Sequence, residues 1–206
     1  DITIGFNNML KRNINTNEIA SYNDPTEYGF GNFPHLSTRL PDYIYSSHTS
    51  LPSLTDGDVW INPNITNFAV GGKGFWLGMH ELGHALGLIH DGVNGNIPYG
   101  TQALPFWEAS RLYTVMDYGV PNIPNNVPTD LFPITPMVYD IAQIQNLYGK
   151  NTTTNQGSTT YTFGDNTHPF ADKTEGIYDN PGKVMMTLWD ADGEHDIIDA
   201  SNMHKA

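Results

Sequence analysis

Apolar side chains recur at helical spacing from Phe75 to Leu88, and they predict a helix that is buried on most sides. Gly78 and Gly83 lie inside this segment, although glycine costs about 1 kcal/mol relative to alanine in a helix. Glycines at such positions often allow close packing against a neighbouring element. We therefore expect this helix to be the central element of the fold.

A second stretch of helical periodicity follows Thr135. Its apolar positions lie three or four residues apart: Met137, Ile141, Ile144 and Tyr148. Thr135 can cap the N-terminus of this helix, Pro136 suits its first position, and Gly149 can end it. This pattern predicts a second long helix between those residues.

Alternating apolar and polar positions predict strands before the first helix and again near the end of the chain. Residues 2–6 and 57–62 show this pattern, and residues 39–46 form a third predicted strand. Pro41 favours a sheet edge for that third strand, because proline cannot donate a hydrogen bond to a neighbouring strand. Short strands are expected in the C-terminal part as well, among them residues 184–189.

The order of these elements indicates the fold class. Two long helices with strands mostly ahead of them favour an α+β fold with a mixed β-sheet. Residues 7–35 are polar with little periodicity, so we expect a long loop there with one helical turn near Met9. We expect the main domain in residues 1–150. Residues 151–206 begin with a stretch rich in Thr, Asn and Gly and should form a short β-rich C-terminal segment.

The charge balance narrows the range of partners. The net charge is −13 with nine Lys and Arg residues, so nucleic acid and anionic membrane surfaces are poor partners. Such an acidic excess suits a secreted, soluble protein. The chain contains no cysteine, which excludes thiolate metal ligands and disulfide bonds. No apolar run approaches the roughly 18 residues of a membrane span.

Candidate metal chemistry is concentrated in residues 80–91, His-Glu-Leu-Gly-His-Ala-Leu-Gly-Leu-Ile-His-Asp. His80 and His84 are four residues apart, so on a helix they share one face and can bind one zinc ion. Gly87 can adopt a left-handed conformation and turn the chain, which brings His90 back as a third ligand. Three protein ligands and one open position are typical of a catalytic zinc site.

Glu81 adds a base to this pattern. It follows the first ligand, lies off the ligand axis, and can reach a water on the metal without binding the metal itself. A lone His-Glu-x-x-His pair arises by chance fairly often. The glycine and the third histidine at fixed offsets make chance a much weaker explanation.

Four aspartates lie within ten residues near the end of the chain: Asp190, Asp192, Asp196 and Asp199. Close carboxylates repel one another unless a cation joins them, and oxygen ligands suit calcium. Asp190, Asp192 and Asp196 are therefore candidate calcium ligands. A solvated acidic turn is the alternative that this pattern leaves open.

The motif of residues 80–90, together with Met116 in the stretch Thr-Val-Met-Asp-Tyr, resembles the metzincin zinc endopeptidases. Within that group the chain is most similar to the serralysins, which are secreted bacterial proteases. Four stretches resemble, in order, their third strand, active-site helix, second long helix and the lead-in to their calcium-binding β-roll: residues 1–7, 80–88, 136–149 and 188–199.

The resemblance implies a role for each matching residue. His80, His84 and His90 would bind zinc. Glu81 would be the general base. Tyr118 would ligate zinc in the resting enzyme and move to assist catalysis when substrate binds, although a half-buried tyrosine without such a role is the alternative.

The resemblance also implies roles for larger parts of the chain. Met116 would form a hydrophobic floor under the metal, and residues 39–46 would be the edge strand that pairs with an extended polypeptide substrate. Residues 1–150 would be a zinc metalloprotease catalytic domain whose first strands precede Asp1. Residues 151–206 would lead into a calcium-binding C-terminal region.

Two features depart from the serralysin pattern. Asp91 stands where serralysins usually have proline. Aspartate there is typical of adamalysins, but adamalysins are rich in cysteine and lack the tyrosine that Tyr118 would match. The Gly-Gly-x-Gly-x-Asp repeat of the calcium roll is absent from this sequence.

We therefore predict a secreted, extracellular endopeptidase that hydrolyses peptide bonds with zinc-activated water and Glu81 as base. Its expected cofactors are Zn²⁺ and, at the acidic segment, Ca²⁺. The resemblance implies a monomer that acts on extended polypeptides and that a protein inhibitor can block. The alternatives are another metzincin subfamily with a different specificity, or an inactive zinc- and calcium-binding module that captures peptides. The intact Glu81 favours an enzyme.

Overall fold

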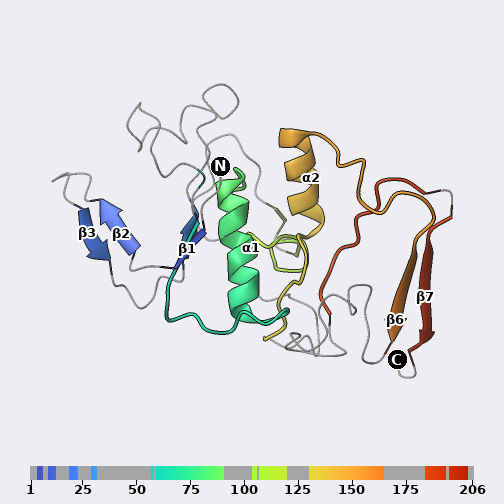
Figure 1. Cartoon of the computed structure of the whole chain (residues 1–206), viewed down its shortest axis with the longest axis horizontal. Coiled ribbons are helices and arrows are strands. Elements are labelled where there is room, and N and C mark those ends of the chain that lie inside the picture. Colours follow the sequence, from blue (N-terminus) through green and yellow to red (C-terminus); the bar gives the residue numbers. More distant parts are fainter. Residues whose placement is uncertain are drawn as a thin grey trace.

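The computed structural model of the chain describes residues 4–6, 9–12, 19–22, 29–31, 57, 59–90, 104–105, 107–119, 130–164, 184–193 and 195–203. The helices and strands within these residues are shown in Figure 1. In chain order they are β1 (Ile4–Phe6), β2 (Met9–Arg12), β3 (Ile19–Tyr22), β4 (Gly29–Gly31), β5 (Val59–Ile61), α1 (Lys73–Ala85), α2 (Val138–Tyr148), β6 (Thr160–Gly164) and β7 (Ile197–Asn202).

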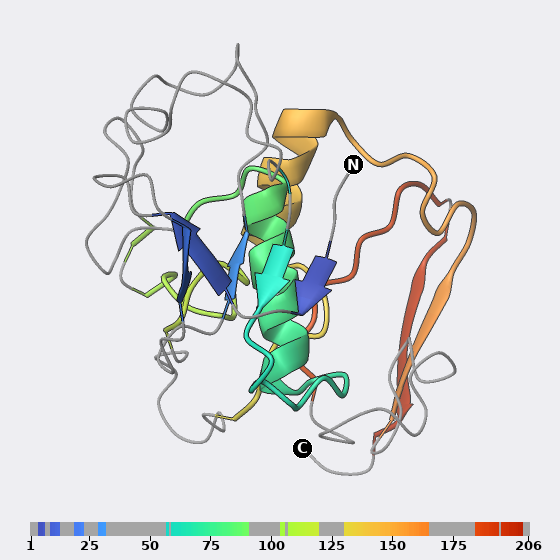
Figure 2. The ribbon, with the colours of Figure 1, turned by 60° about the vertical axis from the view of Figure 1, so that its left-hand side comes forward.

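A small mixed sheet lies beside the first helix. Its strand order is β1-β5-β4, and β5 pairs in parallel with β1 and antiparallel with β4. α1 packs against β4 and β5, and Figure 2 shows the helix running alongside the sheet. The strands predicted at residues 2–6 and 57–62 are thus found, in shorter form, as β1 and β5. The mixed sheet and the two helices agree with the α+β class.

The N-terminal part departs from the predicted long loop. Met9 begins β2 instead of a helical turn, and it pairs with Tyr22 in an antiparallel β2–β3 pair. Met9 and Tyr22 are more than ten positions apart, and such a contact leaves little trace in a local hydrophobic pattern. The predicted edge strand at residues 39–46 lies outside the described residues.

α1 is the buried centre of the fold and ends in a tight glycine turn. Gly87 has a φ of 96°, and its N–H donates to the carbonyl of His84 at 2.9 Å. The next N–H, that of Leu88, donates to the carbonyl of Gly83, also at 2.9 Å. This pair of bonds is a Schellman motif, which satisfies the last helical carbonyls and needs a left-handed residue at the glycine. The turn predicted at Gly87 is therefore confirmed.

The hydrophobic core forms around α1 and the segment that contains Met116. Its fully buried members come from β5, α1, the turn after α1, the 115–116 segment, the start of α2 and the C-terminal part: Val59, Ile61, Trp76, Leu77, Ala85, Leu88, Val115, Met116, Met137 and Met185. These side chains are remote in sequence, and their burial holds the helix against segments from both sides.

α2 begins later than predicted because the expected cap is engaged elsewhere. The N-cap is Met137, and the hydroxyl of Thr135 donates to the carbonyl of Thr187 and accepts the N–H of Thr187. The carboxylate of Asp140, in the first turn, accepts the N–H of Met137 at 2.7 Å. Gly149 ends the helix, as predicted, with a φ of 93°.

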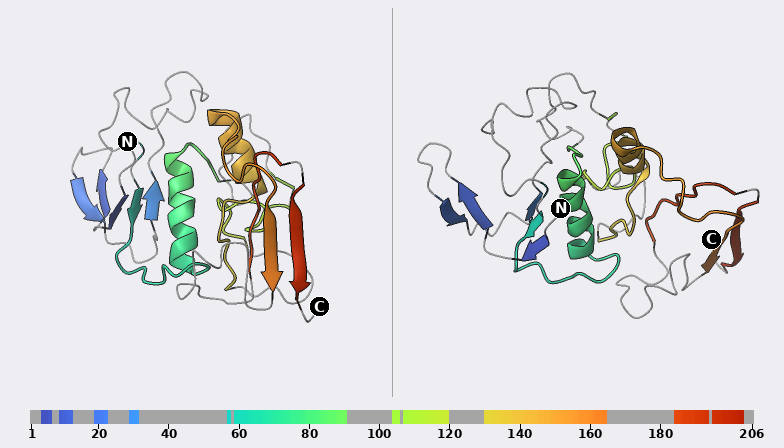
Figure 3. Two further views of the ribbon diagram at one scale, coloured as in Figure 1. Left: turned by 45° about the vertical axis from the view of Figure 1, so that its right-hand side comes forward. Right: turned by 45° about the horizontal axis from the view of Figure 1, so that its top comes forward.

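The C-terminal residues form a separate pair of strands. β6 and β7 pair in parallel, and Figure 3 shows them on the side of α2 that faces away from the three-stranded sheet. The strand predicted at residues 184–189 is reduced to an isolated bridge between Pro133 and Met185. No described helix has the length and apolar character needed to cross a bilayer.

We predict different effects for alanine at two of the glycines inside α1, Gly78 and Gly83. A Cβ at Gly83 would lie 2.5 Å from Sδ of Met116, which is itself 2% exposed, whereas a Cβ at Gly78 would meet Ile61 Cδ1 at 3.9 Å. Gly83→Ala should lower the free energy of unfolding by about 1–3 kcal/mol through overpacking. Gly78→Ala should be neutral or stabilise by up to about 1 kcal/mol. Urea unfolding of both variants checks this, and equal effects would contradict it.

Candidate metal centre

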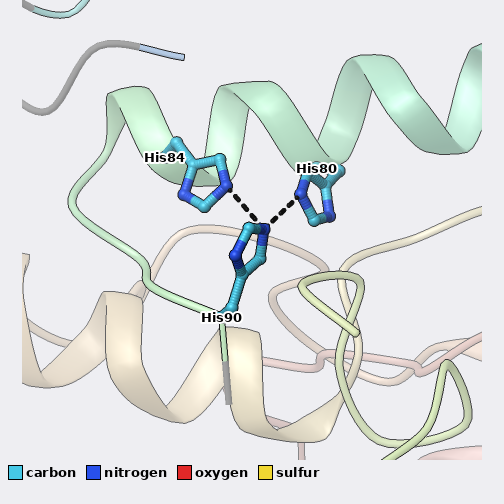
Figure 4. Close-up of side chains that lie close together, drawn as sticks. All are labelled: His80, His84 and His90. Atoms are coloured by element: carbon cyan, nitrogen blue, oxygen red, sulfur yellow. Dashed lines mark hydrogen bonds between the residues drawn. The ribbon is translucent and has the colours of Figure 1, made fainter. Parts of the chain in front are cut away.

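Three histidines converge on one point at the C-terminal half of α1. His80 and His84 lie one turn apart on the same side of the helix, and the glycine turn brings His90 back to face them (Figure 4). Nε2 of His90 lies 3.0 Å from Nε2 of His80 and 3.1 Å from Nε2 of His84. Among the described residues, this is the group of His, Cys, Asp or Glu side chains with metal-ligand spacing.

Backbone carbonyls fix the protonation of the two helical imidazoles. Nδ1 of His80 lies 2.8 Å from the carbonyl oxygen of Val115, and Nδ1 of His84 lies 2.9 Å from that of Leu88. A carbonyl oxygen can only accept, so each Nδ1 is the donor. In the neutral rings each Nε2 therefore carries a lone pair, and these lone pairs face the shared point.

The chemistry of this cluster fits a metal ion. Two Nε2 lone pairs face His90, whose own Nε2 can donate a proton to one of them at a time. A cation at the shared point would satisfy all three nitrogens at once, and imidazole nitrogen is a preferred ligand of zinc. Carbonyl groups that bind the opposite ring nitrogens are a usual feature of metal-bound histidines.

Burial keeps the three rings in the form that binds metal. It lowers the pKa of His80 to about 3, with the neighbouring charge of His84 adding to the effect. Burial and the charge of His90 lower the pKa of His84 to about 4. Burial also lowers the pKa of His90, and the negative charge of Asp117 acts against this shift. Neutral imidazole is the ligand form, because a proton and a metal compete for the same lone pair.

Tyr118 lies at the edge of the cluster. Its hydroxyl is 3.0 Å from Nε2 of His80, and its ring meets the ring of Trp76 edge-on. Its side chain is 46% exposed, so it borders the histidines and solvent together. Partial burial, with the negative charge of Glu81, raises the pKa of Tyr118 to about 12.

Glu81 and Met116 are two buried residues close to the histidine cluster. Glu81 is 2% exposed on α1, and its charge is felt at Tyr118. Met116 is also 2% exposed, and its sulfur packs on the backbone of Gly83, between the two helical histidines. Met116 therefore packs under the histidine-bearing turn.

A further set of buried residues, which sequence patterns did not single out, supports the cluster. Trp76 donates its ring N–H to the carbonyl of Val115 at 3.1 Å. The carboxylate of Asp140 accepts the hydroxyl of Thr114 at 2.6 Å and the N–H of Val115 at 2.8 Å. Burial raises the pKa of Asp140, and these hydrogen bonds act against the shift. One sequence signal could have identified Asp140: it lies in the first turn of a predicted helix, where acidic residues are favoured.

The aspartates of the acidic segment accept hydrogen bonds from residues 157–161. Asp190 accepts the hydroxyl of Tyr161 at 2.6 Å, and Asp192 accepts the N–H of Gly157 at 3.2 Å. Asp196 accepts the N–H of Thr159 at 3.0 Å. Within the described part of the chain, these aspartates do not form a cluster with metal-ligand spacing. Calcium binding by them stays a prediction. Asp91 lies outside the described residues.

Comparison with known proteins finds relatives that are similar to most of this chain. No family model matches it. It is 32% identical to the serralysin of a Photorhabdus species over 92% of this chain and 39% of that protein. It is 28% identical to the serralysin of Proteus mirabilis over 88% of this chain and 33% of that protein.

Serralysin A of Dickeya chrysanthemi is 32% identical over 77% of this chain and 33% of that protein. The chain therefore spans between a third and two-fifths of the length of these relatives. The similarity covers most of this chain in each case, including a relative above 30% identity at 92% coverage. Over the part that it spans, the chain is serralysin-like.

Proposed function

We propose that this chain contains the catalytic site of a zinc-dependent endopeptidase of the serralysin type. The observation that supports the proposal best is the convergence of three Nε2 atoms, with that of His90 at 3.0 and 3.1 Å from those of His80 and His84. The Nδ1 atoms of His80 and His84 are each bound to a backbone carbonyl. The serralysins that resemble the chain support the same proposal, because serralysins are proteases.

His80, His84 and His90 would hold the zinc ion. Zinc, when bound, supplies a Lewis acid for a peptide carbonyl and lowers the pKa of water. Glu81 would take a proton from the attacking water and deliver it to the leaving amine. The hydroxyl of Tyr118, at the exposed side of the cluster, would donate a hydrogen bond to the oxyanion that develops on the substrate carbonyl.

The remaining expectations follow from the same proposal. Residues 1–150 would form the catalytic domain, with residues 39–46 as the strand that pairs with an extended polypeptide. Residues 151–206 would lead into a calcium-binding region, with Asp190, Asp192 and Asp196 as ligands. The protein would be secreted and monomeric, and a protein inhibitor could block its site.

The role of Glu81 is separable from metal binding. Glu81→Gln in the intact protein should keep one zinc per chain and lose about 10²–10⁴-fold of casein or gelatin cleavage, the range typical for loss of a general base. Metal analysis and a digest with and without a chelator measure both quantities. Glu108→Gln, at a carboxylate bound to Tyr139 outside the histidine cluster, is the control and should keep its activity. A zinc-loaded wild type that cleaves nothing would contradict the protease proposal.

Removing the Tyr118 hydroxyl should affect turnover more than metal binding. Tyr118→Phe should lower kcat by about 10²-fold, the cost typical of losing one oxyanion donor, with zinc content and KM nearly unchanged. Tyr139→Phe removes a hydroxyl that donates to Glu108 and serves as the matched control. Steady-state kinetics on a fluorogenic peptide decides the matter. Unchanged kcat in Tyr118→Phe would assign Tyr118 a packing role.

Zinc should stabilise the fold through the third histidine. At a free zinc concentration about 100 times Kd, binding should add about 2.7 kcal/mol to the free energy of unfolding and raise Tm. His90→Ala should lose most of that gain, whereas His195→Ala, at an exposed histidine outside the cluster, should keep it. Thermal melts with and without zinc report the difference. The same gain in both variants would place zinc elsewhere.

A further inference from the structure

A continuous chain of hydrogen bonds joins the buried carboxylate of Asp140 to the imidazole of His80. Oδ1 of Asp140 accepts the hydroxyl of Thr114 at 2.6 Å, and that hydroxyl oxygen accepts the N–H of Met116 at 3.0 Å. The same peptide group, at its other end, offers the carbonyl of Val115 to Nδ1–H of His80 at 2.8 Å.

All the donors in this chain point the same way, toward the carboxylate. The imidazole donates to the peptide carbonyl, the peptide N–H donates to the hydroxyl, and the hydroxyl donates to Asp140. Hydrogen bonds in such a series polarise one another, and the effect is greater where water is excluded. Asp140 is 2% exposed, Thr114 4% and His80 0%, so the chain runs through the interior from end to end.

The negative end of the chain is held firmly. The second oxygen of Asp140 accepts two backbone N–H groups, from Val115 at 2.8 Å and from Met137 at 2.7 Å. Two donors on that oxygen favour the ionised carboxylate and fix its orientation. The position of Asp140 in the first turn of α2 adds the favourable end of the helix dipole.

We propose that Asp140, Thr114 and the Val115–Met116 peptide form a relay that positions His80 and increases the electron-donating strength of its Nε2 toward a metal ion. The relay makes the Val115 carbonyl a stronger acceptor, which draws the Nδ1 proton of His80 and enriches the opposite nitrogen. Asp140 and Thr114 are positioning residues, because they act on the cluster through the peptide. The inference rests on the proposed function only in taking zinc as the metal.

His84 provides an internal reference for this relay. Its Nδ1–H donates to the carbonyl of Leu88, in the turn of its own helix, and not to the 114–116 segment. The two helical imidazoles therefore make the same kind of bond to different parts of the backbone. A change confined to Thr114 should reach His80 and leave His84 as it was.

The test compares three variants of the intact protein. Thr114→Val removes the hydroxyl and keeps the shape, Thr114→Ser restores the hydroxyl, and Asp140→Asn removes the charge. Thr135→Val is the matched control, because the hydroxyl of Thr135 likewise donates one hydrogen bond and accepts another, here with the carbonyl and the N–H of Thr187, but lies outside the relay.

The first readout is the Nδ1–H proton resonance of each histidine in the metal-free protein. Thr114→Val and Asp140→Asn should move the His80 resonance upfield and leave His84 in place, and Thr114→Ser should restore the wild-type position. A purely structural role for Thr114 predicts instead that both resonances move together or that neither moves. That outcome would overturn the relay.

The second readout is the Kd for Zn²⁺ and Co²⁺ from competition with a chelator. Thr114→Val and Asp140→Asn should weaken binding by about 10- to 100-fold, the range typical of outer partners of metal-bound histidines, and Thr135→Val should not. Wild-type Kd in both relay variants would refute the inference. Neither readout uses peptide cleavage, so failure of the relay and failure of the protease proposal give different results.

Discussion

The carbonyl oxygen of Val115 is the contact on which the site depends. Trp76 and His80, one turn apart on α1, both donate to it, at 3.1 and 2.8 Å. The N–H of the same residue donates to Asp140 on α2, so the backbone of Val115 joins the two long helices. Because both donors are buried, loss of this acceptor would leave two polar groups without water or protein partners. The fold and the candidate metal centre are therefore stabilised by the same contact.

Gly83 affects both the packing of the core and the geometry of the candidate metal centre. The glycine allows Met116 to pack directly on the helix backbone between the two helical histidines. The same residue provides the carbonyl that accepts Leu88 N–H in the turn leading to His90. One small residue thus sets both the depth of the core under the cluster and the direction in which the chain leaves the helix. The proposed zinc site and the hydrophobic core cannot be changed independently there.

Sequence patterns predicted the parts of this molecule that local spacing determines. Two histidines four residues apart and a glycine three residues beyond the second fix the cluster, because helix geometry and one left-handed residue suffice. The parts that distant residues determine were missed. Thr135 looked like a helix cap, but Thr187, far along the chain, engages its hydroxyl. Met9 pairs across to Tyr22, and Asp140 reaches Val115 from another helix.

The three histidines differ in how much freedom they lose on binding a metal. His80 and His84 are buried, with one ring nitrogen of each tied to the backbone, so their order is established when the chain folds. His90, after the glycine turn, is only partly buried and is the most exposed of the three. Metal binding therefore restricts mainly the side chain of His90 and the short backbone segment between Gly87 and His90, and most of the conformational entropy lost on binding is lost there. Most of the entropy needed to order the three ligands is thus lost when the chain folds, before a metal ion binds.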